Sequence, residues 1–233
     1  MKRRVAHDRA KREHAPVSST ALSDTHALPA GDFSAWLRDM RRALAGGPGM
    51  DVACGTCVGC CTSSYYIKVR PHEGEALRHI PPEHRSAAQG EPEGTWLMGY
   101  DAHGHCPMFG AGGCSIYPHR PETCRIYDCR VFTAAGMNAG AGRSVINERV
   151  ARWRFEYPTE EARQEHRAVT AAAAFLRQHP VRFPGGHIPS RPADIAVLAV
   201  KSYTVFMQPP ANDAEAAAGI VAACREFDRA RAG

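Results

Sequence analysis

The chain is organised around Cys54-Gly55-Thr56-Cys57-Val58-Gly59-Cys60-Cys61, a C-x2-C-x2-C-C motif. Four further cysteines follow it: Cys106, Cys114, Cys124 and Cys129. Eight of the nine cysteines therefore lie within residues 54–129. The basic N-terminus lacks the apolar segment of a secretory signal, so we expect a cytoplasmic protein whose thiols stay reduced. Clustered reduced thiols are better explained as metal ligands than as disulfides.

The spacing of the first four cysteines is typical of metal binding. Two cysteines separated by two residues can turn both sulfurs toward one ion, and this spacing occurs twice in the motif. The first three cysteines also match the first three ligands of a bacterial ferredoxin. Cys60 and Cys61 are sequence neighbours whose side chains tend to diverge. They can more easily coordinate two different metal ions, or two edges of one cluster, than a single ion.

Eight thiols predict two four-ligand sites. One arrangement places Cys54, Cys57, Cys60 and Cys106 in one site and Cys61, Cys114, Cys124 and Cys129 in the other. The expected cofactor is zinc or iron, the latter as an ion or as an iron–sulfur cluster. Four thiolates close the coordination shell of zinc, which argues against hydrolysis, whereas iron would permit electron transfer. No catalytic residue is assigned.

Other polar residues in this region receive weaker expectations. His105 and His119 could substitute for a ligand, but with eight thiols present we expect them at the surface. Three arginines near the second cysteine group, Arg120, Arg125 and Arg130, are expected to offset thiolate charge. The acidic residues Glu122 and Asp128 are expected to be solvated. Cys224 lies apart on an apolar helical face and is expected to be a small buried hydrophobe.

The cysteine pattern resembles the YkgJ-type cysteine-cluster family, known for a zinc- or iron-chelating CxxCxxCC domain. Besides the motif, the resemblance rests on Cys106-Pro107-Met108-Phe109, Gly113-Cys114-Ser115-Ile116-Tyr117, Arg120-Pro121 and Cys124-Arg125. It covers residues 54–129. It implies a metal-binding protein, and members are often labelled iron–sulfur oxidoreductases without a defined reaction. Flagellin lysine methylase carries a similar cluster, so the resemblance also allows a protein-modifying enzyme.

The net charge argues against a nucleic-acid partner. The chain carries +5, of which residues 1–15 supply +4 through six basic and two acidic residues. The remainder is nearly neutral, whereas a nucleic-acid-binding domain usually has its own basic face. No run of apolar residues is long enough to predict a membrane span. The partner that the sequence predicts is a metal ion, and no protein partner can be named.

Three regions are predicted, with a mainly α fold that includes a small, loop-rich, metal-stapled cysteine module with a few short strands. Residues 1–31 are polar and are expected to form a disordered basic tail. Residues 32–132 hold a helix and the eight-cysteine module, and residues 144–233 a helical C-terminal region. Metal should contribute directly to folding, because the module has few apolar residues.

Local signals place the expected elements. Asp32 is a predicted N-cap for a helix that ends at Gly46, and Thr159 is one for a helix that follows it. Residues 65–69 and 96–100 are predicted strands that could pair. Helices are expected over 72–80, 145–157 and 195–206, the last with a strand as alternative, while 83–95 is expected to be a loop. Asn212 and Glu215 predict a capping box on the final helix.

Three classes of function stay open. The first is a metal-binding module with a structural or metal-handling role. The second is an iron–sulfur oxidoreductase or protein-modifying enzyme. The third is a zinc-stapled interaction protein, which could use the basic residues 1–15.

Overall fold

The computed structural model describes residues 27–50, 52, 54–111 and 113–232. These residues are mainly α, about 52% helical with a few short strands, which confirms the predicted fold class. The α-helices are α1 (Phe33–Leu44), α2 (Gly74–His79), α3 (Glu122–Ile126), α4 (Arg130–Ala134), α5 (Ser144–Arg152), α6 (Glu160–Gln178), α7 (Pro192–Ser202) and α8 (Asp213–Ala232). Short 3-10 helices are η2 (Gly59–Thr62), η3 (Pro82–His84), η4 (Tyr117–His119), η5 (Pro180–Arg182), η6 (Pro184–Gly186) and η7 (Tyr203–Phe206).

The strands form three small sheets within the described residues. β1 (Leu28–Asp32) pairs in parallel with β7 (Trp153–Glu156). β4 (Trp96–Met98) lies between β2 (Ile67–Val69) and β3 (Arg85–Ala87), antiparallel to both. β5 (Phe109–Gly110) and β6 (Gly113–Cys114) form a short hairpin. The predicted pairing of the 65–69 and 96–100 strands is therefore confirmed.

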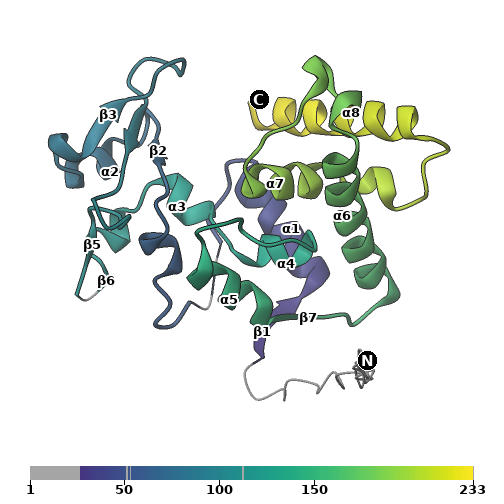
Figure 1. The fold of residues 1–233 in the computed structure, drawn as a ribbon, viewed down its shortest axis with the longest axis horizontal. Coiled ribbons are helices and arrows are strands. Elements are labelled where there is room, and N and C mark those ends of the chain that lie inside the picture. The colour runs from purple at the N-terminus through teal and green to yellow at the C-terminus, as the bar shows by residue number, and fades with distance from the viewer. Residues whose placement is uncertain (1–26, 51, 53, 112, 233) are drawn as a thin grey trace, which may run out of the picture.

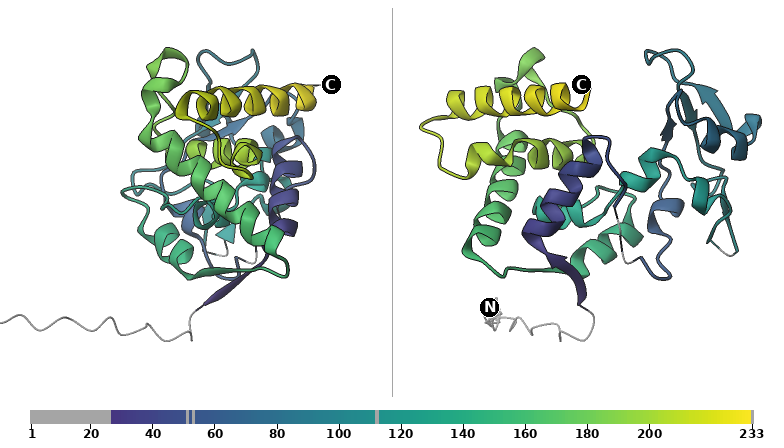
Figure 2. Two further views of the ribbon diagram at one scale, coloured as in Figure 1. Left: turned by 90° about the vertical axis from the view of Figure 1, so that its right-hand side faces the viewer. Right: turned by 180° about the vertical axis from the view of Figure 1, so that it is seen from behind.

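Two lobes are visible in Figure 1 and, from behind, in Figure 2. The strand lobe, residues 67–119, contains α2, β2 to β6 and η4. The helical lobe contains α1 and α4 to α8, with β1 and β7 below them in Figure 1. α3 lies where the lobes meet.

The helical lobe holds the larger hydrophobic core. Its central members come from α1, α4, α6 and α7, and include Phe33, Phe132, Val169 and Val200, none of them measurably exposed. α1 contributes residues at helical spacing, as its sequence predicts, beginning directly after the cap Asp32. The Asp32 carboxylate accepts a hydrogen bond of 2.6 Å from Ala35 N. This core draws on residues from both predicted structured regions of the chain.

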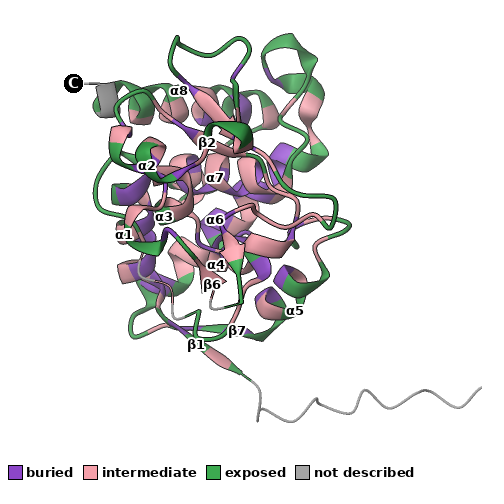
Figure 3. Cartoon of the chain, turned by 90° about the vertical axis from the view of Figure 1, so that its left-hand side faces the viewer, coloured by how far each residue is buried: buried purple, intermediate pink, exposed green. Residues whose placement is uncertain are grey.

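A second, smaller core lies in the strand lobe. It consists of Val69, Ala76, Ile80, Met98, Met108 and Ile116, with Cys106 and Cys114 packed against it. So few apolar side chains bury little area, and burying one such side chain is worth about 1.5–3 kcal/mol before the entropy of ordering the chain is subtracted. In Figure 3 this lobe faces the viewer, and most of its ribbon is exposed or of intermediate burial.

Several sequence expectations need correction. Residues 1–26 of the expected tail lie outside the described residues, but Leu28–Asp32, expected as tail and cap, form β1. The helix expected over 145–157 ends at Arg152, and Trp153–Glu156 form β7 with alternating burial. The loop expected over 83–95 contains η3 and β3. The helix expected over 195–206, by contrast, is confirmed as α7 and η7.

Other local expectations are confirmed. Thr159 caps α6 by accepting a 3.1 Å hydrogen bond from Ala162 N. Asn212 accepts from Glu215 N at 3.0 Å, while the Glu215 carboxylate accepts from Ala211 N rather than from Asn212 N. No helix in the described part of the chain is long and apolar enough to cross a membrane.

Candidate metal centre

The first cysteine loop leaves α1 and is folded by its own backbone. Cys57 N donates to Cys54 O at 2.9 Å, and Cys61 N to Val58 O at 2.9 Å. Gly55 has φ +55°, a conformation that glycine adopts without strain. A side chain at Gly59 would lie 3.2 Å from Val145 and Ile146 on α5. This close approach explains the glycine and holds the loop against the helical lobe.

The second group of cysteines comes from three separate segments. Cys106 precedes the β5–β6 hairpin and Cys114 ends it, while Cys124 lies in α3 and Cys129 immediately before α4. Cys106 N donates to Cys61 O at 2.8 Å, which joins the two halves of the module. All eight thiols are free, and each is at least partly exposed.

Electrostatic interactions place seven of the eight sulfurs in two neighbourhoods, with Cys60 between them. The charges that raise the pKa of Cys129 include those of Cys54 and Cys57. The charges that oppose ionisation of Cys61 come instead from Cys106, Cys114 and Cys124. Cys60 lies between the two, because it interacts with Cys54 as well as with Cys106 and Cys124. These neighbourhoods differ from the arrangement suggested by the sequence. There, Cys106 shares a site with Cys54 and Cys57, and Cys129 shares a site with Cys61.

The thiols are gathered less tightly than a bound ion requires. A tetrahedral zinc site with Zn–S bonds of about 2.3 Å places its sulfurs about 3.8 Å apart. Among the described residues, no cysteine belongs to a group of three or more potential ligand atoms that lie within 4.8 Å of one another. The donor set nevertheless suits zinc or iron in kind and number.

Burial raises the pKa of four of the eight thiols, those of Cys54, Cys106, Cys124 and Cys129. It raises the pKa of Cys124 to about 12 and that of Cys129 to about 12. The pKa of Cys60 is raised chiefly by the hydrogen bond that its thiol donates to Cys61, and the same bond lowers the pKa of Cys61. A nucleophilic cysteine needs a lowered pKa, so Cys124 and Cys129 do not suit that role. A divalent cation would replace their protons, because its charge favours the thiolates.

Residues outside the motif position Cys129. The Trp153 indole N–H donates to Cys129 Sγ at 3.2 Å. The adjacent Asp128 carboxylate accepts from Trp36 Nε1 at 2.8 Å and from Arg130 N at 2.8 Å, and it forms an ion pair with the Arg130 guanidinium. The cysteine is therefore held by α1, α4 and β7 together.

These supports correct two sequence expectations. Asp128 is not solvated, because only 2% of it is exposed. Arg130, expected to offset thiolate charge, forms an ion pair with Asp128. Glu122 is also largely buried, with its carboxylate 3.2 Å from Arg70. Neither Trp36 nor Trp153 could be assigned from the motif, because each is far from it in sequence.

The sequence analysis also did not identify a positively charged side chain beside the first cysteine loop. Arg149 on α5 donates to Cys54 O at 3.2 Å, and its charge opposes the rise in the Cys54 pKa that burial causes. Arg120 acts in the same sense on Cys124, as expected. Arg125 donates to Arg120 O. Cys224, far from the module on α8, is half-buried, and burial raises its pKa.

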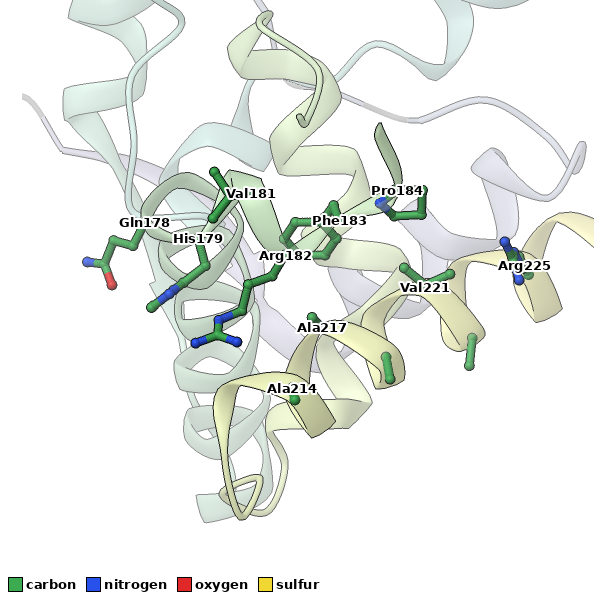
Figure 4. Close-up of a pocket in the computed structure, with 12 residues that line it drawn as sticks. Gln178, His179, Val181, Arg182, Phe183, Pro184, Ala214, Ala217, Val221 and Arg225 are labelled. Carbon is green, nitrogen blue, oxygen red and sulfur yellow. The ribbon is translucent and has the colours of Figure 1, made fainter. Parts of the chain in front are cut away.

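A wide pocket of about 970 Å³ lies elsewhere, between η5, η6 and α8. Figure 4 shows Phe183 and Arg182 on one side of it and Ala217 and Val221 on the other. None of its lining residues is a cysteine. It is therefore separate from the candidate metal centre.

Comparison with known proteins supports the metal assignment. Residues 53–149 match the model of the CxxCxxCC family, described as "Putative zinc- or iron-chelating domain". The match confirms the resemblance to the cysteine-cluster family over this stretch, and it extends beyond Cys129, the last cysteine of the module, to Arg149. No curated protein and no solved structure matches the chain. Zinc or iron binding is therefore the function that similarity supports.

Proposed function

We propose that this protein binds zinc or iron through eight cysteine thiolates arranged as two four-ligand sites. One site would use Cys54, Cys57, Cys60 and Cys129, and the other Cys61, Cys106, Cys114 and Cys124. The match of residues 53–149 to the zinc- or iron-chelating family carries the metal-binding proposal. The two electrostatic neighbourhoods, with Cys60 between them, support the grouping of the ligands. Bound zinc would supply structural cross-links, and bound iron would add redox chemistry.

The weak core of the strand lobe supports a structural contribution of the metal. Cys106 and Cys114 pack against that small core, whereas Cys129 packs against the larger one. The Cys106 N to Cys61 O bond joins the first cysteine loop, which packs on α5 of the helical lobe, to the strand lobe. Ions held there would tie the strand lobe to the helical lobe, as structural metal sites do in small domains.

The iron-dependent alternative differs in one measurable property. A closed zinc site is colourless and redox-inactive, whereas thiolate-bound iron–sulfur clusters absorb visible light. Anaerobically purified protein should therefore be assayed for zinc, iron and acid-labile sulfide, with a visible spectrum of the same sample. About two zinc atoms per chain without colour would favour structural sites. Iron with sulfide would favour redox chemistry, and one metal atom per chain would contradict the two-site proposal.

Double variants test how the ligands are grouped. If Cys57 and Cys129 share a site, Cys57→Ser with Cys129→Ser should lose one ion only, while Cys57→Ser with Cys106→Ser should lose both. The alternative arrangement, with Cys106 beside Cys57, predicts the reverse. Cys224→Ala is the matched control, because this half-buried cysteine lies outside the module and should leave the metal content unchanged.

A further inference from the structure

A second set of potential metal ligands lies in the strand lobe, and it contains no sulfur. Glu75 and His79 come from α2, and His119 comes from η4. Their ligand atoms all lie within 4.8 Å of one another. His79 Nε2 is 3.2 Å from Glu75 Oε1, and His119 Nδ1 is 3.4 Å from the same oxygen.

We propose that Glu75, His79 and His119 form an additional binding site for a divalent cation of the zinc class. Two imidazoles and one carboxylate are a common ligand set for zinc when one position is left open for water. Ligand bonds of about 2.0–2.1 Å in a tetrahedron place donor atoms roughly 3.3–3.4 Å apart. The two separations at Glu75 Oε1, 3.2 Å and 3.4 Å, are within about 0.1 Å of this range. The site goes beyond the proposed thiolate function and does not depend on it.

The backbone that carries the three ligands is well supported. Glu75 and His79 are four residues apart on α2, which places them on the same helical face. Ala76 and Ile80 anchor α2 in the small core, and Ile116, immediately before η4, is buried in the same core. His119 N donates to Ile116 O at 2.8 Å. The strand lobe's interior thus fixes both halves of the site.

Buried polar contacts fix α2 further. The carboxylate of Glu73, a residue only 7% exposed, accepts from Arg70 N at 2.7 Å and from Glu122 N at the start of α3. These bonds hold the residue that precedes α2 against a segment distant in sequence. The backbone of α2, which carries Glu75 and His79, is therefore held in place before an ion binds. This reduces the conformational entropy that binding costs.

The side chains themselves remain free to adjust. The side chains of Glu75, His79 and His119 are 52%, 41% and 37% exposed. The two imidazole rings are stacked, with centroids 3.9 Å apart and planes 10° from parallel. Convergence on one ion requires the rings to rotate out of this stack, and their exposure permits it. Solvent access also leaves room for water in the open position.

Neighbouring arginines affect the site differently. Arg78 forms an ion pair with Glu75 Oε2, so it competes for the carboxylate that would bind the cation. Arg120, next to His119, is directed elsewhere: its Nε donates to Tyr117 O at 2.9 Å, and its guanidinium lies over the Tyr117 ring. Removing the Arg78 charge should therefore strengthen cation binding.

Cobalt titration of the full-length protein, with its thiolate sites already loaded with zinc, tests the proposal. Cobalt bound by nitrogen and oxygen gives visible bands without the intense near-ultraviolet charge transfer of cobalt thiolate. We expect one additional equivalent with the nitrogen–oxygen spectrum. His79→Ala with His119→Ala should abolish it, and Arg78→Ala should bind it more tightly.

His72→Ala is the matched control. His72 is exposed in the same lobe and lies 3.4 Å from the Glu122 carboxylate, but it belongs to no group of three ligands among the described residues. Its substitution should leave the additional equivalent in place. Absence of that equivalent in the wild type, its persistence in the His79/His119 double variant, or its loss in Arg78→Ala would overturn the proposal. A thiolate spectrum would report on the cysteine sites alone, so the two proposals fail separately.

Discussion

Replacing Asp128 with alanine should destabilise the protein by about 3 kcal/mol. The Asp128 side chain is fully buried, and the Arg130 side chain with which it pairs is 12% exposed. Removing one member of a buried ion pair typically costs about 3–5 kcal/mol. Arg130 keeps a 3.1 Å hydrogen bond to Ala30 O, which places the expected cost at the lower end. Part of this cost is the buried Trp36 N–H, which loses its 2.8 Å acceptor.

Two further variants separate charge from shape. Asp128→Asn retains an oxygen for the Trp36 N–H but removes the charge, so it should cost about 1.5–3 kcal/mol. Asp128→Asn combined with Arg130→Met should be less destabilised than the sum of the single changes, because no unpaired buried charge remains.

Urea unfolding of the metal-saturated proteins, followed by tryptophan fluorescence, measures these differences at constant m-value. Saturation matters because ligand binding to the folded state adds to stability. A loss below about 1 kcal/mol for Asp128→Ala would refute the reasoning, since surface ion pairs have that value.

Three other predictions follow from named contacts. Asp32→Ala should lower stability by about 1 kcal/mol through loss of the α1 cap, measured by urea unfolding. Trp153→Phe removes the N–H donated to Cys129 and should weaken metal affinity about tenfold or more, measured by competition with a chelator. Burial lowers the pKa of His166, against hydrogen bonds to Thr133 and Ala134. Its contribution to stability should be complete above about pH 6.5 and lost as the pH falls through the lowered pKa, and His166→Gln should reduce that dependence.

The sequence predicted best those features that depend on interactions between residues close together in the chain. Asp32 and Thr159 could be identified as caps because a cap depends on its own side chain and a backbone N–H three residues later. The β2–β4 pairing could be anticipated from two short β-type segments. These features need little information from the rest of the chain.

Long-range features could not be read in the same way. Leu28-Pro29-Ala30-Gly31 has the composition of a loop, and it is a strand only because β7 pairs with it. Trp153–Glu156 alternates between buried and exposed residues, but it directly follows a helical pattern that concealed the change of period. Asp128 is buried because Trp36, 92 residues away, donates to it.

The cysteines illustrate the same limit within the candidate site. Their spacing predicted metal ligation, and the family match supports zinc or iron chelation. Their grouping depends on how the segment from Cys106 to Cys129 folds back, which spacing does not encode. Glu75, His79 and His119 are separated by up to 44 positions and follow no ligand motif, so only the fold brings them together.

The parallel β1–β7 pair has a consequence for the order in which the chain assembles. Leu28 and Trp153 are partners 125 positions apart, and every cysteine of the module lies between them. Ribosomal synthesis therefore releases all eight thiols before β7 exists. An ion that already joins Cys54 to Cys129 shortens the loop that β1 and β7 must close to about 50 residues, which lowers its entropic cost by roughly 0.8 kcal/mol. Early metal loading would thus hasten closure of the helical lobe as well as ordering the module itself.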